Sequence, residues 1–267
     1  MFRVAVLVVA LSAVSGAAFA AVVGPTARLL NAEPLRARPL IREETPAVGD
    51  AVVAWAQNRG PGSESFDTWL RLGTSAPRRV NPRGTEGFPG GFDGTRLAYQ
   101  QSDEQGNSDL WIYDVASSRR AKLGRHVNTG EWEWGASLAG SWVLFGRGTL
   151  QGIIDPGDRL VLLVNRATGE RRELARTDTL DTEVYPGQVS GNYAVWSVCR
   201  LRHGRVLCDT FLHDIENRDT RKLPSGGAPA QFAASVTSSG TVYAARGAAV
   251  AVSRRGSSAS TRAHRQS

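Results

Sequence analysis

The sequence predicts an all-β protein, a β-propeller of about five four-stranded blades with the last blade incomplete. A glycine followed closely by a short apolar run occurs five times, at Gly49, Gly94, Gly140, Gly191 and Gly240, with spacings of 45, 46, 51 and 49 residues. The surrounding four-strand pattern recurs with it, and helical periodicity is scarce. Sheets that are apolar on both faces need cover on both faces, so the repeated sheets should stack. A β-sandwich, the chief alternative, would not explain recurrence of the whole unit.

The first 20 residues have the layout of a secretory signal peptide. One positive charge at Arg3 precedes an uncharged, mostly apolar stretch, and Ala18-Phe19-Ala20 is an A-x-A cleavage pattern. We therefore expect a secreted, periplasmic or envelope location in a bacterium. The alternative is an uncleaved membrane tether, because Val4–Val23 is uncharged and about 20 residues can span a bilayer.

Each repeat can be followed from its inner to its outer strand. An aromatic residue six positions before three of the glycines marks the inner strand: Phe88, Trp134 and Tyr185. The second strand follows the glycine. An Asx residue, which favours a tight turn, ends the third strand in three repeats: Asp114, Asn165 and Asp214.

Pairs of basic residues mark the outermost strands: Arg78-Arg79, Arg119-Arg120, Arg171-Arg172 and Arg221-Lys222. Positive charge on an unpaired strand edge blocks edge-to-edge aggregation, which is one interpretation of these pairs. The other is a basic rim that attracts anionic envelope polymers or lipid headgroups.

The second repeat resembles that of TolB-like β-propellers. The resemblance is carried by Phe92-Asp-Gly-Thr-Arg-Leu-Ala-Tyr99 and by Gly106-Asn-Ser-Asp-Leu-Trp-Ile-Tyr-Asp114. It extends as a degenerate pattern from Gly49 to Ala245, and it implies the fold more than an activity. TolB-like proteins have six blades and a separate N-terminal domain, which this chain is too short to contain.

The two ends of the repeat region are less regular. Residues 21–253 form the expected propeller, in which residues 21–42 either supply the inner strand of the first blade or close the ring. Ala248–Val252 is a candidate third strand for the last blade. Residues 254–267 are rich in Arg and Ser without apolar periodicity, so we expect a disordered tail.

The two cysteines are expected to form a disulfide. His203-Gly204 is a plausible two-residue hairpin turn, and counting back from it places Cys199 opposite Cys208. Two reduced, buried thiols are the alternative.

No catalytic constellation is apparent, so the sequence predicts a protein that is not an enzyme and has no cofactor and no metal. A Ser-His-Asp site would have to use His126 or His213, and no G-x-S-x-G motif is present. The oxygen-rich stretch Asp103–Asp109 lacks the length of an EF-hand loop and reads better as a solvated hairpin.

Acidic and aromatic residues recur beside the inner strands. They are Glu86, Phe88, Glu131, Trp134, Glu183 and Tyr185. One interpretation gives them a shared structural role. The other is a ligand-binding ring at the mouth of the central channel of the propeller, suited to a cation, a sugar or a basic peptide.

We expect a monomeric scaffold that binds an envelope protein or glycan. The formal charge of +7 comes almost entirely from Arg, and an exported protein is a poor partner for nucleic acid. The alternative is a propeller glycosidase or lyase that uses channel-mouth carboxylates. An accessory subunit of a larger envelope complex is a third possibility, and it predicts a large exposed apolar patch.

Overall fold

A computed structural model describes residues 42–148, 158–203, 205–224, 231–246 and 249–253. The regular elements in these ranges are β-strands, which form five antiparallel sheets. In every sheet, strands that follow one another in the chain are neighbours. The predicted all-β propeller fold is confirmed, and each sheet is one blade.

Four blades have four strands. Blade 1 contains β1 (Glu43–Gly49), β2 (Val52–Asn58), β3 (Phe66–Leu72) and β4 (Arg78–Arg79). Blade 2 contains β5 (Glu86–Asp93), β6 (Arg96–Ser102), β7 (Ser108–Asp114) and β8 (Arg119–Lys122). Blade 3 contains β9 (Trp132–Ala139), β10 (Trp142–Gly148), β11 (Arg159–Asn165) and β12 (Arg171–Thr177). Blade 4 contains β13 (Thr182–Ser190), β14 (Tyr193–Arg202), β15 (Arg205–Asp214) and β16 (Asp219–Lys222).

Blade 5 has three strands within the described residues: β17 (Gln231–Val236), β18 (Val242–Arg246) and β19 (Ala249–Ser253). The last of them confirms the expected third strand. The inner strand of blade 1 is β1, so residues 21–42 do not supply it, and their alternative role in closing the ring falls outside the described residues. The predicted signal peptide and tail lie outside them as well.

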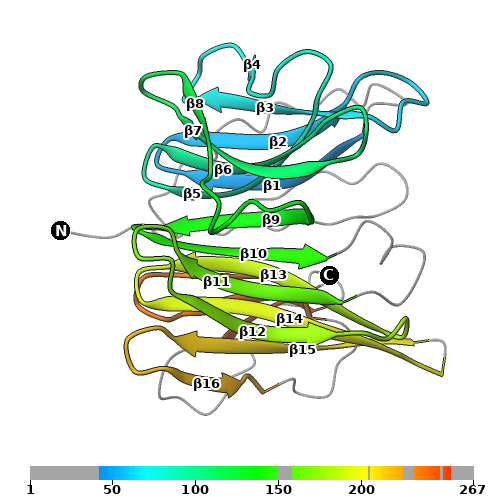
Figure 1. Ribbon diagram of the computed structural model, residues 1–267, viewed down its shortest axis with the longest axis vertical. Coiled ribbons are helices and arrows are strands. Elements are labelled where there is room, and N and C mark those ends of the chain that lie inside the picture. Colours follow the sequence, from blue (N-terminus) through cyan, green and yellow to red (C-terminus); the bar gives the residue numbers. More distant parts are fainter. Residues whose placement is uncertain (1–41, 149–157, 204, 225–230, 247–248, 254–267) are drawn as a thin grey trace, which may run out of the picture.

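Successive blades pack face to face through their inner strands, β1 against β5, β5 against β9, β9 against β13, and β13 against β17. Figure 1 shows blades 1 and 2 in the upper half of the molecule and blades 3 and 4 below them. One apolar core lies at each of the four junctions. On β6, Leu97 and Tyr99 belong to the core shared with blade 1, whereas Ala98 belongs to the core shared with blade 3. This alternation is why no blade can bury its apolar residues alone.

The recurring glycine has a conformational cause. Gly94, Gly140, Gly191 and Gly240 adopt φ values between 56° and 78°, in the tight turn that joins the first two strands of a blade. Glycine reaches this left-handed region without steric cost, so it marks the same turn in successive repeats. Blade 1 is the exception, because Ala51 takes the left-handed conformation there with φ 55°.

Candidate functional site

The two ends of the blades differ in the length of their connections. At one end, tight turns such as Gly94-Thr95 and Gly140-Ser141 join the first two strands of a blade. At the other end the inner and third strands begin, and longer segments such as 59–65, 103–107 and 178–181 lie there (Figure 1). We call this second end the loop face. The site residues expected from the sequence lie on it or beside it.

The three inner-strand aromatics occupy equivalent positions, because Phe88, Trp134 and Tyr185 face Gln100, Gly146 and Ser197 on the neighbouring second strands. Their surroundings differ. The Phe88 ring lies 5.2 Å from the Phe66 ring of blade 1, and Trp134 stacks on Trp132 at 4.9 Å. Tyr185 is 40% exposed. Two of the aromatics thus pack against other rings, and the third meets solvent.

The three acids are not equivalent. Glu86 and Glu183 occupy matching positions near the start of their inner strands, facing Ser102 and Cys199. In blade 3 the matching residue, opposite Gly148, is Trp132, and Glu131 lies exposed in the loop before β9. Glu183 is ion-paired with Arg159 of blade 3. The structure therefore places Glu86 and Glu183 alike and puts Glu131 outside the pattern.

A repeated contact between blades explains part of this arrangement. The first residue of a third strand reaches the inner strand of the next blade. The contacts made in this way are Phe66 with Phe88, the Ser108 hydroxyl with the Glu133 carbonyl at 2.7 Å, and Arg159 with Glu183. Phe88 and Glu183 therefore hold neighbouring blades together at the loop face.

Sequence reasoning missed a buried ion pair between β9 and β10. The Glu133 side chain is fully buried, and its Oε1 lies 3.1 Å from the Arg147 Nε. Thr129 donates to the same oxygen through its hydroxyl at 2.8 Å and its backbone N–H at 3.1 Å. Burial raises the pKa of Glu133 and lowers the pKa of Arg147. Two oppositely charged residues 14 apart give no sequence signal of burial, so only the register reveals the pair.

Two buried asparagines were also missed. The Asn81 Oδ1 accepts the Thr68 N–H at 2.8 Å, and the Asn128 Oδ1 accepts the Leu110 N–H at 2.7 Å. Both asparagines follow an outermost strand and satisfy the backbone of the third strand of their own blade. Their separation of 47 residues, close to the repeat length, is the signal that would have found them.

Some basic residues of the outermost strands bind the next blade. Arg78 donates to the Val115 carbonyl of blade 2 at 2.8 Å, and Arg172 donates to the Ile215 carbonyl of blade 4 at 2.7 Å. Arg172 also lies 3.1 Å from the Nε2 of His213. Burial is the largest influence lowering the pKa of His213, and the Arg172 cation adds to it. These contacts give both arginines and the histidine a structural role between blades.

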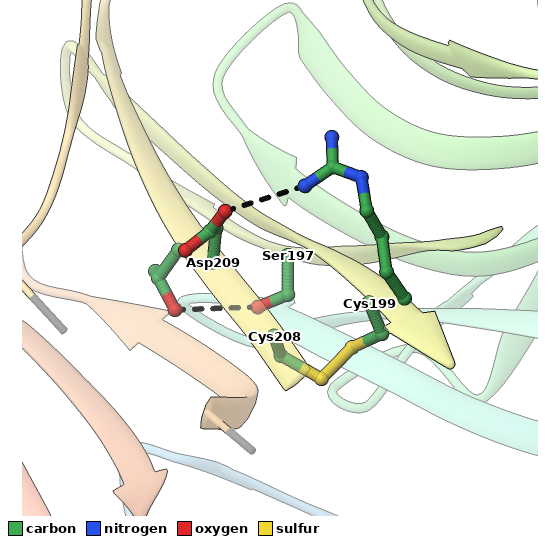
Figure 2. The surroundings of a disulfide bond; sticks show 6 residues. Ser197, Cys199, Cys208 and Asp209 are labelled. Atoms are coloured by element: carbon green, nitrogen blue, oxygen red, sulfur yellow. Dashed lines mark hydrogen bonds and ion pairs between the residues drawn. A yellow bond between two sulfur atoms is a disulfide. The ribbon is translucent and has the colours of Figure 1, made fainter. Parts of the chain in front are cut away.

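The expected disulfide is present. Cys199 and Cys208 are joined with their Cα atoms 3.9 Å apart, in the register that was counted from the turn, since Arg202 faces Arg205. Figure 2 shows the bond crossing the β14–β15 hairpin next to Ser197 and Asp209. Arg200 lies 3.4 Å from the Asp209 carboxylate on the same hairpin.

Thiol titration checks this bond in solution. We expect the denatured, unreduced protein to show no free thiol and the reduced protein to show two. Replacing both Cys199 and Cys208 with Ser should lower the free energy of unfolding by about 2–3 kcal/mol, because the bond restricts the unfolded chain. Two reactive thiols before reduction would contradict the assignment.

Exposed apolar side chains gather on the loop face. Among the described residues, six large apolar side chains are exposed, and five of them lie at this end of blade 4: Leu180, Tyr185, Leu201, Val206 and Leu207. The sixth, Leu72, lies at the other end of blade 1. The described residues contain no group of three His, Cys, Asp or Glu side chains placed to hold a metal. They also contain no helix able to cross a bilayer.

Comparison with known proteins supports the fold. No protein-family model matches the chain, and neither does any curated protein sequence. Among solved structures, TolB from Acinetobacter baumannii is 15% identical with a TM-score of 0.50, and the similarity covers 79% of this chain and 51% of TolB. Acylaminoacyl peptidase from Pyrococcus horikoshii is 11% identical with a TM-score of 0.50, over 80% of this chain and 38% of the peptidase. The chain thus spans about half of TolB or less than half of the peptidase, and the similarity concerns the propeller fold.

Proposed function

We propose that the chain is an exported, non-enzymatic β-propeller that binds a protein or glycan partner in the cell envelope through its loop face. One observation carries the proposal: five of the six exposed large apolar side chains among the described residues lie at this end of the propeller, in the β14–β15 hairpin, in β13 and in the connection before β13. Apolar side chains gathered in this way mark interaction sites, and loops on a rigid scaffold are where folds of this kind place binding residues.

The disulfide supports export. Bonds between cysteines persist in oxidising compartments such as the periplasm or the exterior and are rare in the cytosol. The Cys199–Cys208 bond agrees with the signal-peptide pattern of residues 1–20.

The accessible residues divide into contact and support roles. Tyr185, Leu180 and Leu201 are exposed and would supply apolar contact area. Glu131 is exposed and Glu86 is half-buried, so they would form a polar rim. Phe88, Trp134 and Glu183 would position these groups through the contacts between blades and rings described above.

A glycosidase needs two carboxylates on either side of the bond to be cleaved, one of them with a raised pKa. Burial raises the pKa of Glu133, but the side chain is fully buried and therefore out of reach of a sugar. Glu183 is held by Arg159. Glu133 and Glu183 are therefore poorly placed to serve as the two carboxylates of a glycosidase.

Replacing Leu180 and Leu201 with Asp should reduce partner recovery tenfold or more, which corresponds to about 1.4 kcal/mol of binding free energy. The measurement is recovery of cross-linked partners from the envelope fraction of the producing cells, quantified by mass spectrometry. Leu72→Asp, at the opposite end of the propeller, is the matched control and should recover partners like the wild type. Equal recovery by both variants would exclude the loop face as the binding surface.

A further inference from the structure

The outer edge of β15 is open over half of its length. Its residues pair with β14 from Tyr193 opposite Asp214 to Arg202 opposite Arg205. On the other side, β16 pairs only with Phe211–Asp214, and the Leu223 N–H donates to the Thr210 carbonyl at 2.8 Å. Within the described part of the chain, no strand pairs with the remaining segment, Arg205–Asp209, on the side away from β14. Figure 1 shows this hairpin projecting beyond the neighbouring strands.

This open edge differs in chemistry from the other outer edges. The outermost strands β4 and β8 consist largely of Arg and Lys, which discourage pairing with a second chain. The β15 segment instead has Val206 and Leu207 at its centre, each 43% exposed. An exposed apolar strand edge is a template for pairing with another strand, because its backbone N–H and C=O groups also lack partners.

The segment is complementary to itself. It reads Arg205-Val-Leu-Cys-Asp209. When a second copy pairs antiparallel with its centre at Leu207, Arg205 of each chain lies opposite Asp209 of the other, which gives two such pairs. Leu207 then faces its own copy. Alternate side chains share a face of a strand, so these three residues form one stripe. Opposite charges directly across two strands stabilise pairing, and like charges oppose it.

We propose that two copies of the chain associate through this edge, forming a symmetric dimer in which the Arg205–Asp209 segments pair antiparallel. A two-fold axis through Leu207 uses the same surface on both copies, as closed dimers do. Arg205 has no ion-pair partner among the described residues, so it is available to the second copy. Asp209 binds Lys222 at 2.8 Å and Arg200 at 3.4 Å, yet keeps 23% of its side chain exposed.

The disulfide prepares the edge for pairing. Cys208 lies within the segment and is tied to Cys199 on β14, which still pairs with β13 at this point, so the bond fixes β15 where β16 no longer pairs with it. The proposal replaces the expectation of a monomer. Two of the five exposed loop-face side chains, Val206 and Leu207, belong to the paired segment, whereas Leu180 and Tyr185 do not, and Leu201 lies on the other face of the hairpin from Arg205 and Leu207. The test of partner binding changes Leu180 and Leu201, so the two proposals are tested on different residues.

Charge reversal tests the register. Sedimentation equilibrium of the purified exported protein should give a mass that rises with concentration toward twice that of one chain. Arg205→Glu should stay at the mass of one chain, because the introduced carboxylate would face the Asp209 carboxylate of the other copy. Asp209→Arg should do the same, because the introduced guanidinium would face Arg205. An equimolar mixture of the two variants should dimerise again, because both facing pairs then have opposite charges.

Arg119→Glu, on the outermost strand of blade 2, is the matched control and should dimerise like the wild type. A wild-type mass that stays at one chain at every concentration would overturn the proposal. So would Arg205→Glu dimerising like the wild type, or a mixture of folded variants that remains monomeric. Recovery of partners by the dimer-deficient Arg205→Glu variant reports on the loop face separately, so the failure of either proposal can be recognised.

Discussion

Replacing Arg147 with Met should lower the free energy of unfolding by about 3–5 kcal/mol at pH 7. The Glu133 carboxylate is fully buried and relies on Arg147, 3.1 Å away, for its neutralising charge. Thr129 donates two hydrogen bonds to the same oxygen, but the Oε2 atom has no partner among the described residues. Removing the guanidinium would leave a buried negative charge uncompensated. Equilibrium urea unfolding of the two proteins measures the difference.

The loss of unfolding free energy caused by Arg147→Met should depend on pH in a defined direction. Burial raises the pKa of Glu133, with Asp109 adding to the effect, so the folded protein binds this proton more tightly than the unfolded chain. A raised pKa contributes stability that is present below the unfolded value and is lost as the pH rises through the folded value. Losing the Arg147 cation raises the folded pKa further. The difference between variant and wild type should therefore shrink as the pH is lowered from about 7 toward about 4.5, near the usual pKa of a glutamate.

The double variant Glu133→Leu with Arg147→Met separates the lost pair from lost packing. Apolar side chains of similar volume often replace a buried ion pair without loss, so this protein should be within about 1 kcal/mol of the wild type. If Arg147→Met lowers the free energy of unfolding equally at both pH values, the buried charge is not the cause of the instability. The same conclusion follows if the double variant is as unstable as the single one.

Local patterns were enough to predict the fold. The repeated glycine marks a turn that needs a left-handed backbone conformation, which glycine adopts without strain. The glycine is therefore present even in repeats whose neighbouring residues differ. The Cys199–Cys208 register followed from counting outward from one turn, because residues paired across a hairpin are fixed by its loop. Both predictions depend only on residues that are close to one another in the sequence.

The candidate site was harder to predict because it depends on register between strands that an irregular connection separates. The sequence shows Glu131 shifted relative to Glu86 and Glu183, and the pairing of β9 with β10 puts Trp132 in the matching position and buries Glu133. A difference of one residue moves a side chain to the other face of a strand, and loop length alone does not reveal it. Contacts between blades, such as Arg159 with Glu183, combine residues from two repeats, so the sequence of neither repeat indicates the contact.

A very close approach between blades 2 and 3 involves Gly90. A Cβ atom there would lie 1.7 Å from the Ala136 carbonyl oxygen and 2.7 Å from its carbon, both backbone atoms of β9. Backbone cannot rotate away as a side chain can, so the two inner strands would have to separate. Ala136 belongs to the core between these blades, together with Leu138 and Phe145, and that core would loosen with them.

Gly90→Ala should therefore cost more than about 3 kcal/mol, beyond the usual range for overpacking. That is a large part of the total stability of a typical domain, about 5–15 kcal/mol, so the variant should show a much lower urea midpoint or fail to fold. Gly124→Ala is the matched control: nothing lies within 4 Å of its added Cβ, and neither glycine has a positive φ. We expect the control to stay within about 1 kcal/mol of the wild type. Equal midpoints for the two variants would mean that blades 2 and 3 do not approach as closely as Gly90 and Ala136 indicate.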